Sequence, residues 1–146
     1  PMLTKPIHIP HGQGAHFDYA QDHCFVKLAA QDTSSHTSFV VDEIKPGFYL
    51  ERHHHKIMTE VFYVLEGEIK FIFDDETLLL KEGDTAVVPP NVWHIASCPH
   101  GGRVITIFVN GNFDEYLNRV STLSDEELAD KALMKKVSTE YDIYHE

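Results

Sequence analysis

Short apolar segments alternate with turn signals along most of the chain. Segments of this length, rich in β-branched and aromatic residues, predict strands rather than helices. The breaks between them carry residues that favour turns, as at Asp74-Asp75, 81–84 and 89–91. The expected strands are residues 24–29, 38–44, 61–65, 69–73, 77–80, 86–88, 93–97 and 104–109. A succession of short strands is typical of a β-sandwich or a β-barrel.

The pattern changes after Gly111, where apolar residues recur at the spacing of one helix face. These residues are Phe113, Tyr116, Leu117 and Val120. Ser124 and Glu127 then have the spacing of a capping box, which predicts a second helix from about residue 125 to residue 138. We expect both helices to cover an open sheet edge or one end of the barrel, and to take no part in catalysis.

Length and composition fit a single domain that spans residues 1–146. With 42% hydrophobic residues, a chain of 146 residues can bury a substantial core, and no break in composition marks a second domain. We expect the barrel at about 20–110 and the helical tail at about 112–140.

Acidic residues dominate the charge: 12 Lys and Arg stand against 23 Asp and Glu, which gives a net charge of −11. Because no basic stripe is present, we expect neither nucleic acid nor an anionic membrane as a partner. No apolar run reaches the roughly 18 residues of a membrane span. The opening segment, PMLTKPIHIPHGQG, lacks the apolar core of a signal peptide, so a cytoplasmic protein is expected. Cys24 and Cys98 form no CxxC motif and are expected to be reduced thiols.

Two short clusters hold the strongest functional signal, which is a set of potential metal ligands: His53, His55, Glu60 and His94. His53 and His55 are two residues apart on an extended segment and therefore point to the same side, whereas His54 faces away. Glu60 follows a turn expected at 56–59. Three imidazoles and one carboxylate make a mixed donor set that suits Fe, Mn, Co, Ni or Zn rather than Ca or Mg. The sequence therefore predicts one divalent metal ion per chain.

The first cluster resembles the first sequence motif of the cupin family. That motif reads Gly, five residues, His, one residue, His, three or four residues, Glu, six residues and Gly. Its positions are filled here by Gly47, His53, His55, Glu60 and Gly67.

The second cluster resembles the second cupin motif, which reads Gly, five residues, Pro, one residue, Gly, two residues, His, three residues and Asn. Gly83, Pro89 and His94 match it. Asn91 stands where Gly is usual, and Asn also tolerates a positive φ. Cys98 stands where Asn is usual; it shares the side of His94 and is expected to be a shielded interior thiol.

The resemblance extends over nearly the whole chain. DTSSHTSFVVDEIKPG, EVFYVLEGEI, GNFDEYLNRV and the late YDIY make the sequence similar to the small quercetin dioxygenase-like cupins. The fold that this resemblance implies is all-β: a cupin double-stranded β-helix, or jelly-roll barrel, with two C-terminal α-helices. It also implies a homodimer.

The reaction does not follow from such a fold, because cupins host several chemistries. The resemblance favours a quercetinase-like dioxygenase that acts on a small phenol, enol or diketone with O₂. The alternatives are a non-redox isomerase, lyase, cyclase or hydrolase with Glu60 as general base, and a module that holds a metal and a small ligand without turnover.

Strand alternation predicts which side chains face the interior. With Glu60 pointing inward, Phe62 and Val64 also point inward and Tyr63 points outward.

The strand that carries His53 is harder to orient, because Tyr49 and Glu51 share its parity. A carboxylate inside the barrel is costly, so Glu51 is expected on the rim of the pocket. The alternative is that Glu51 binds a cationic or hydroxyl-bearing group of a substrate. The aromatic residues expected in the core are Phe48, Phe71, Phe73 and Trp93.

Overall fold

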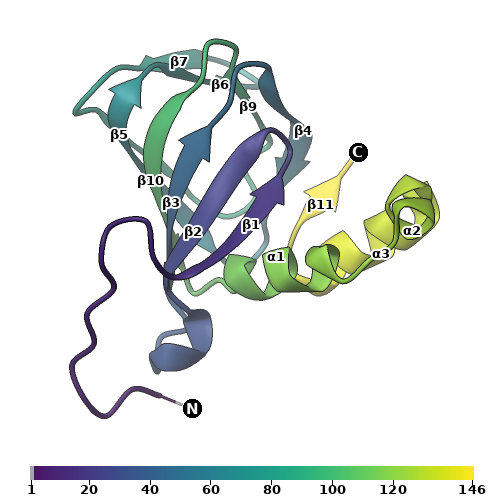
Figure 1. Cartoon of the computed structure of the whole chain (residues 1–146). Coiled ribbons are helices and arrows are strands. Elements are labelled where there is room, and N and C mark those ends of the chain that lie inside the picture. Colours follow the sequence, from purple (N-terminus) through teal and green to yellow (C-terminus); the bar gives the residue numbers. More distant parts are fainter. Residues whose placement is uncertain (1) are drawn as a thin grey trace.

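Two antiparallel sheets face each other across an apolar interior in the computed structural model, which describes residues 2–146 (Figure 1). The first sheet contains, in spatial order, β1 (Ala15–Tyr19), β2 (Asp22–Leu28), β3 (Ser38–Ile44), β10 (Gly102–Val109), β5 (Thr59–Gly67) and β8 (Thr85–Val88). The second contains β11 (Tyr144–His145), β4 (Phe48–His54), β9 (His94–Cys98), β6 (Ile69–Phe73) and β7 (Thr77–Leu80). A 3-10 turn, η1 (Ala30–Asp32), lies between β2 and β3. The expected all-β barrel is confirmed.

The predicted strands are present, with limits that agree to within two residues. Three further strands are present. β4 was expected only as the extended segment that carries His53, whereas β1 and β11, which lie at sheet edges, were missed. β1 is mostly exposed and half polar, so its sequence carries little strand signal. β11 is only two residues long and forms because it pairs with β4.

Two turns depend on a backbone with positive φ. Gly67, at the end of β5, has φ +81°, and a Cβ there would lie 2.8 Å from the carbonyl oxygen of Gly101. Asn91, in the turn before β9, has φ +65°, as expected. The Asn91 N–H donates to the carbonyl oxygen of His55 at 2.6 Å. This turn therefore ties the start of β9 to the segment that carries His55.

Alternate side chains of both sheets fill the barrel. Phe62 and Val64 are buried and Tyr63 is exposed, as alternation predicts. Three of the four expected core aromatics pack in this core: Phe48, Phe71 and Phe73. Cys24 and Cys98 are buried free thiols, and Cys98 Sγ donates to the carbonyl oxygen of Glu68 at 3.2 Å.

Trp93 is the exception, and its placement in the core was wrong. Its ring lies on the outside of the barrel, 4.3 Å from the Arg52 guanidinium and 4.3 Å from the His54 ring. Trp93 precedes His94, which points inward, so alternation turns the indole outward.

Three helices follow the barrel, where two were expected. α1 (Phe113–Ser121) covers one end of the barrel with Tyr116 and Leu117, which are buried. The predicted helix at 125–138 is divided into α2 (Asp125–Ala129) and α3 (Lys131–Glu140). The division lies at Asp130, where the backbone is extended rather than helical. The Asp130 side chain caps α3 by accepting a hydrogen bond from the Leu133 N–H.

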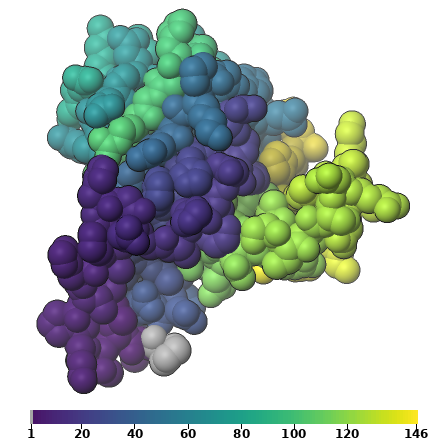
Figure 2. Space-filling view, viewed as in Figure 1, coloured from purple at the N-terminus to yellow at the C-terminus, as the bar shows by residue number. Residues whose placement is uncertain are grey.

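The predicted capping box is present, because Ser124 and Glu127 each bond to the backbone N–H of the other. α2 and α3 stand out beside the barrel as the yellow-green lobe of Figure 2. No helix within residues 2–146 is long and apolar enough to cross a membrane.

Leu117→Ala should lower the free energy of unfolding by about 2–5 kcal/mol, because this side chain is 2% exposed and its loss leaves a cavity under α1. Asn118→Ala, at the next and exposed position, is the matched control and should change it by less than about 0.5 kcal/mol. Urea unfolding measures both. Equal stabilities for the two variants would contradict the packing of α1 on the barrel.

Candidate metal centre

The structure brings the four predicted ligands together inside the barrel: His53 on β4, His55 just beyond it, Glu60 on β5 and His94 on β9. All four are buried, and none is more than 6% exposed. One ligand atom from each lies within 4.8 Å of those of the other three. The pairing of His53 with His94 across β4 and β9 joins the two sequence clusters.

A bulge in β4 decides which of its side chains face the interior. Leu50 pairs with Ala96 and His53 pairs with His94. Between these two pairs the chain advances three residues along β4 but only two along β9, so β4 contains one extra residue. The extra residue changes the parity, and Leu50 lines the pocket while Tyr49 is 53% exposed. The expectation that Tyr49 shares the side of His53 was therefore wrong.

Each imidazole is oriented by a hydrogen bond from its Nδ1 to a backbone carbonyl oxygen. The acceptors are Glu51 at 2.7 Å from His53, Asp142 at 2.8 Å from His55, and Val92 at 2.8 Å from His94. A carbonyl oxygen can only accept, so each Nδ1 carries the proton. The three Nε2 lone pairs therefore face the centre of the cluster, as metal ligands must.

Acceptors meet at this centre without a donor between them. Glu60 Oε1 lies 2.7 Å from His55 Nε2 and 3.2 Å from His94 Nε2. With the ring protons on Nδ1, the buried atoms His55 Nε2 and Glu60 Oε1 have no hydrogen-bond partner. Such opposed lone pairs are stabilised by a cation placed between them. The cluster could therefore bind a metal ion.

The ionisation of these groups fits that role. Burial, and then the neighbouring His94, lowers the pKa of His53 to about 3, so this ring is neutral at pH 7. Burial acts to raise the pKa of Glu60, but His55 and His94 together outweigh it and hold that pKa well below the usual range. Burial likewise acts to lower the pKa of His55, but Glu60 and Asp142 together outweigh it, so the net shift in the pKa of His55 is upward. A proton and a metal ion thus compete at the His55–Glu60 pair.

The C-terminal tail holds the segment between His55 and Glu60 in place. The Asp142 carboxylate accepts hydrogen bonds at 2.8–3.0 Å from three successive backbone N–H groups, those of Lys56, Ile57 and Met58. The carbonyl oxygen of Asp142 accepts the bond from His55 Nδ1. Sequence reasoning gave the tail only a covering role and missed Asp142. The one signal was YDIY, which entered only as part of the family resemblance.

His54 faces away from the centre, as expected. Its ring stacks on Tyr144 with 5.3 Å between the ring centres, and its edge meets Trp93. Tyr144 pairs with His54 in the β11–β4 ladder, so the tail also supports the outer face of the ligand strand.

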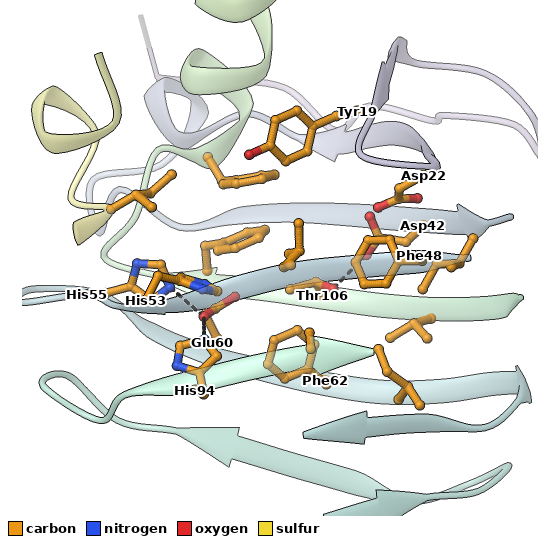
Figure 3. A pocket seen from close by; sticks show the side chains of 18 of the residues that line it. Tyr19, Asp22, Asp42, Phe48, His53, His55, Glu60, Phe62, His94 and Thr106 are labelled. Carbon is orange, nitrogen blue, oxygen red and sulfur yellow. Dashed lines mark hydrogen bonds and ion pairs between the residues drawn. The ribbon is translucent and has the colours of Figure 1, made fainter. Parts of the chain in front are cut away.

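A cavity of about 80 Å³ adjoins the four ligands (Figure 3). Its walls are largely apolar and include Phe48, Leu50, Phe62 and Phe108. Glu51 is exposed and also lines the cavity, which places it on the rim, as expected. Three polar residues that sequence reasoning did not single out line the cavity as well: Asp22, Asp42 and Thr106. Cys98, although buried, does not line it.

Residues 40–110 match the family model described as cupin domain. The barrel is a cupin domain. The RmlC-like cupin from Shewanella frigidimarina NCIMB 400 is similar in structure, with a TM-score of 0.63 and 26% identity, over 77% of this chain and 99% of that one. KdgF from Halomonas sp. has a TM-score of 0.63 and 19% identity, over 73% and 97% of the two chains. At that identity the likeness shows the fold alone.

A curated relative of this cupin is the quercetin 2,3-dioxygenase of Bacillus subtilis (strain 168). The two sequences are 31% identical over 100 residues, which cover 67% of this chain and 29% of that protein. The chain thus spans less than a third of the length of the relative.

Asp142→Asn should lower the free energy of unfolding by about 1–3 kcal/mol, because one carboxylate oxygen that accepts backbone N–H groups becomes a donor. Asn tolerates the φ of +63° at this position, so backbone strain does not confuse the result. Metal affinity should fall about tenfold, since the support of His55 loosens. Urea unfolding and metal titration check the two effects, with Asp125→Asn on exposed α2 as the control. Unchanged values for Asp142→Asn would contradict the role of the tail.

Proposed function

We propose that His53, His55, Glu60 and His94 hold one divalent transition-metal ion, and that the chain is a cupin-type dioxygenase acting on a small phenolic or enolic substrate. The observation that carries the proposal is the convergence of three Nε2 atoms and Glu60 Oε1, without a donor, beside a cavity.

Three imidazole nitrogens and one carboxylate suit Fe, Mn, Co, Ni or Zn, and on an octahedral ion they leave two positions open. When bound, such a metal supplies Lewis-acid chemistry and, if redox-active, chemistry with O₂. Two open positions accommodate a substrate with two chelating oxygens, or a substrate and O₂ together.

The side chains of the chain itself would bind and orient the substrate. The apolar walls, with Phe48 and Phe62 among them, suit a planar ring and exclude water. A cavity of about 80 Å³ favours a single ring over a larger molecule. Glu60 Oε1 lies beside His55 and His94, and Figure 3 shows its second oxygen on the side away from the two dashed contacts. That oxygen is placed to accept the proton of an enol or phenol.

The similarity to a quercetin 2,3-dioxygenase favours oxidative chemistry, although the matched segment is 29% of that protein. The carboxylate beside the cavity equally supports a non-redox isomerase, lyase or cyclase in which Glu60 moves the proton. The experiments below separate these functions from binding without turnover.

Alanine at His53, His55, Glu60 or His94 should lower the bound metal at least about tenfold, because each change removes one ligand. His54→Ala is the matched control: its ring packs on Tyr144 outside the centre, and the variant should keep its metal. Elemental analysis after dialysis measures the content. Full occupancy in His94→Ala would rule out this ligand set.

Protein loaded anaerobically with Fe(II), Mn(II), Co(II) or Ni(II) should consume O₂ with at least one compound of a panel of 3-hydroxy-enones, catechols, diketones and flavonols, and single-ring compounds should react best. Glu60→Gln should lose this activity even where metal remains, since the amide cannot accept the proton. Zn(II)-loaded protein is the control and should take up no O₂, because Zn(II) is redox-inactive. An oxygen electrode and product analysis provide the readout. Product formed under nitrogen, with no O₂ uptake by any metal form, would favour the non-redox reaction instead.

A further inference from the structure

A second polar group lines the cavity: Asp22 on β2, Asp42 on β3 and Thr106 on β10. Their side chains are buried and are 6%, 8% and 4% exposed. Figure 3 shows the Asp22 and Asp42 carboxyl groups facing each other at the end of the pocket away from His53 and His55. The cavity therefore has a polar group at each end and apolar walls between them.

One oxygen of each carboxyl group in this acidic pair accepts a hydrogen bond from a neighbouring side chain. Thr106 Oγ1 donates to Asp42 Oδ2 at 2.6 Å, and the Cys24 thiol donates to Asp22 Oδ2 at 3.3 Å. Asp22 Oδ1 is buried and has no partner. An unpartnered carboxyl oxygen in the wall of a cavity is costly unless a ligand or water donates to it.

The Asp22–Asp42 pair differs from the metal centre because hydrogen-bond donors lie beside its carboxyl groups. The ligand atoms of Asp22, Cys24 and Asp42 lie within 4.8 Å of one another, which is close enough to hold a metal ion. The Cys24 thiol and the Thr106 hydroxyl, however, already place protons against the two carboxyl groups. At the metal centre, in contrast, the converging atoms are acceptors. The second group is thus built for hydrogen bonding.

The pair also retains a proton at neutral pH. Burial, and then the proximity of Asp42, raises the pKa of Asp22 to about 10. Burial raises the pKa of Asp42 as well. Two buried carboxyl groups that share a proton offer one donor and several acceptors. Such a pair binds a hydroxyl or amino group and rejects an apolar one.

We propose that Asp22 and Asp42 bind an O–H or N–H donor on the far side of a ligand whose chelating oxygens lie at the metal centre. The inference rests on the proposed function and narrows its substrate class to a small chelating enol that carries a hydroxyl or amino group across the ring.

The register of the sheet agrees with a ligand of one ring. Glu60 on β5 pairs with Phe108 on β10. The next inward residue on β10 is Thr106, which donates a hydrogen bond to Asp42. Successive inward positions on a strand are about 7 Å apart, which is close to the length of a substituted six-membered ring.

Three hydroxypyranones test this assignment, because they share a chelating hydroxy-ketone and differ at one group across the ring. Kojic acid carries a hydroxymethyl group there, its amine analogue carries an aminomethyl group, and allomaltol carries a methyl group. Calorimetric titration of Ni(II)-loaded protein without O₂ gives the three affinities. Kojic acid or the amine should bind at least about tenfold more tightly than allomaltol, as for one hydrogen bond to a charged group.

Asp22→Ala should reduce this preference to less than about twofold and leave the affinity for allomaltol unchanged, because the acceptor for the distal group is removed. If Asp22→Ala does not fold, the isosteric Asp22→Asn should reduce the preference at least about threefold. Asp114→Asn is the matched control: this buried carboxyl accepts from the Ala30 N–H outside the cavity, and the variant should keep the full preference.

Equal affinity of wild-type protein for all three compounds, or a full preference in the Asp22 variants, would overturn the inference and leave the proposed function standing. If no compound binds the metal-loaded protein, the proposed function fails and this inference with it. A second metal equivalent per chain that Asp22→Ala abolishes would show a metal site in place of the hydrogen-bonding pair.

Discussion

Three backbone carbonyl oxygens impose the constraint on which the site depends. By accepting the Nδ1 protons of His53, His55 and His94, they direct all three Nε2 lone pairs toward the centre of the cluster. When the three rings are neutral, the resulting cluster has converging acceptors with no proton between them. In a buried environment this arrangement is unfavourable alone and favourable around a cation. The backbone therefore prepares the barrel interior for a metal before any metal binds.

The three carbonyls belong to distant parts of the chain, and separate devices hold each of them. Glu51 lies in the bulge of β4, which turns His53 inward. Val92 follows Asn91, whose positive φ and bond to His55 join the two ligand segments. Asp142 lies in the tail and fixes three N–H groups of the turn before Glu60. The centre is thus coupled to the C-terminal end of the fold, which explains why a substitution far along the chain should alter metal affinity.

The inward face of the first sheet contributes side chains to both polar ends of the cavity, the metal cluster and the acidic pair. Glu60 on β5 belongs to the metal cluster, and Thr106 on β10 and Asp42 on β3 belong to the acidic pair. Because alternation sends every second residue of these strands inward, polar groups at the two ends enclose an apolar middle. A ligand held at both ends would be fixed in orientation as well as position, which is how small-molecule sites obtain specificity.

The sequence by itself determined the barrel, the four candidate ligands and the inward side of β5. These depend on local patterns, namely apolar alternation, the spacing of His53, His55 and Glu60, and the second cluster at His94. Tertiary structure decided the rest. The parity of Tyr49 depends on a bulge. The role of Asp142 depends on hydrogen bonds to a turn 86 residues earlier in the chain, and the proximity of Asp22 to Asp42 depends on neighbouring strands. No periodic pattern in the sequence predicts these features, because each arises only when segments far apart in sequence pack together.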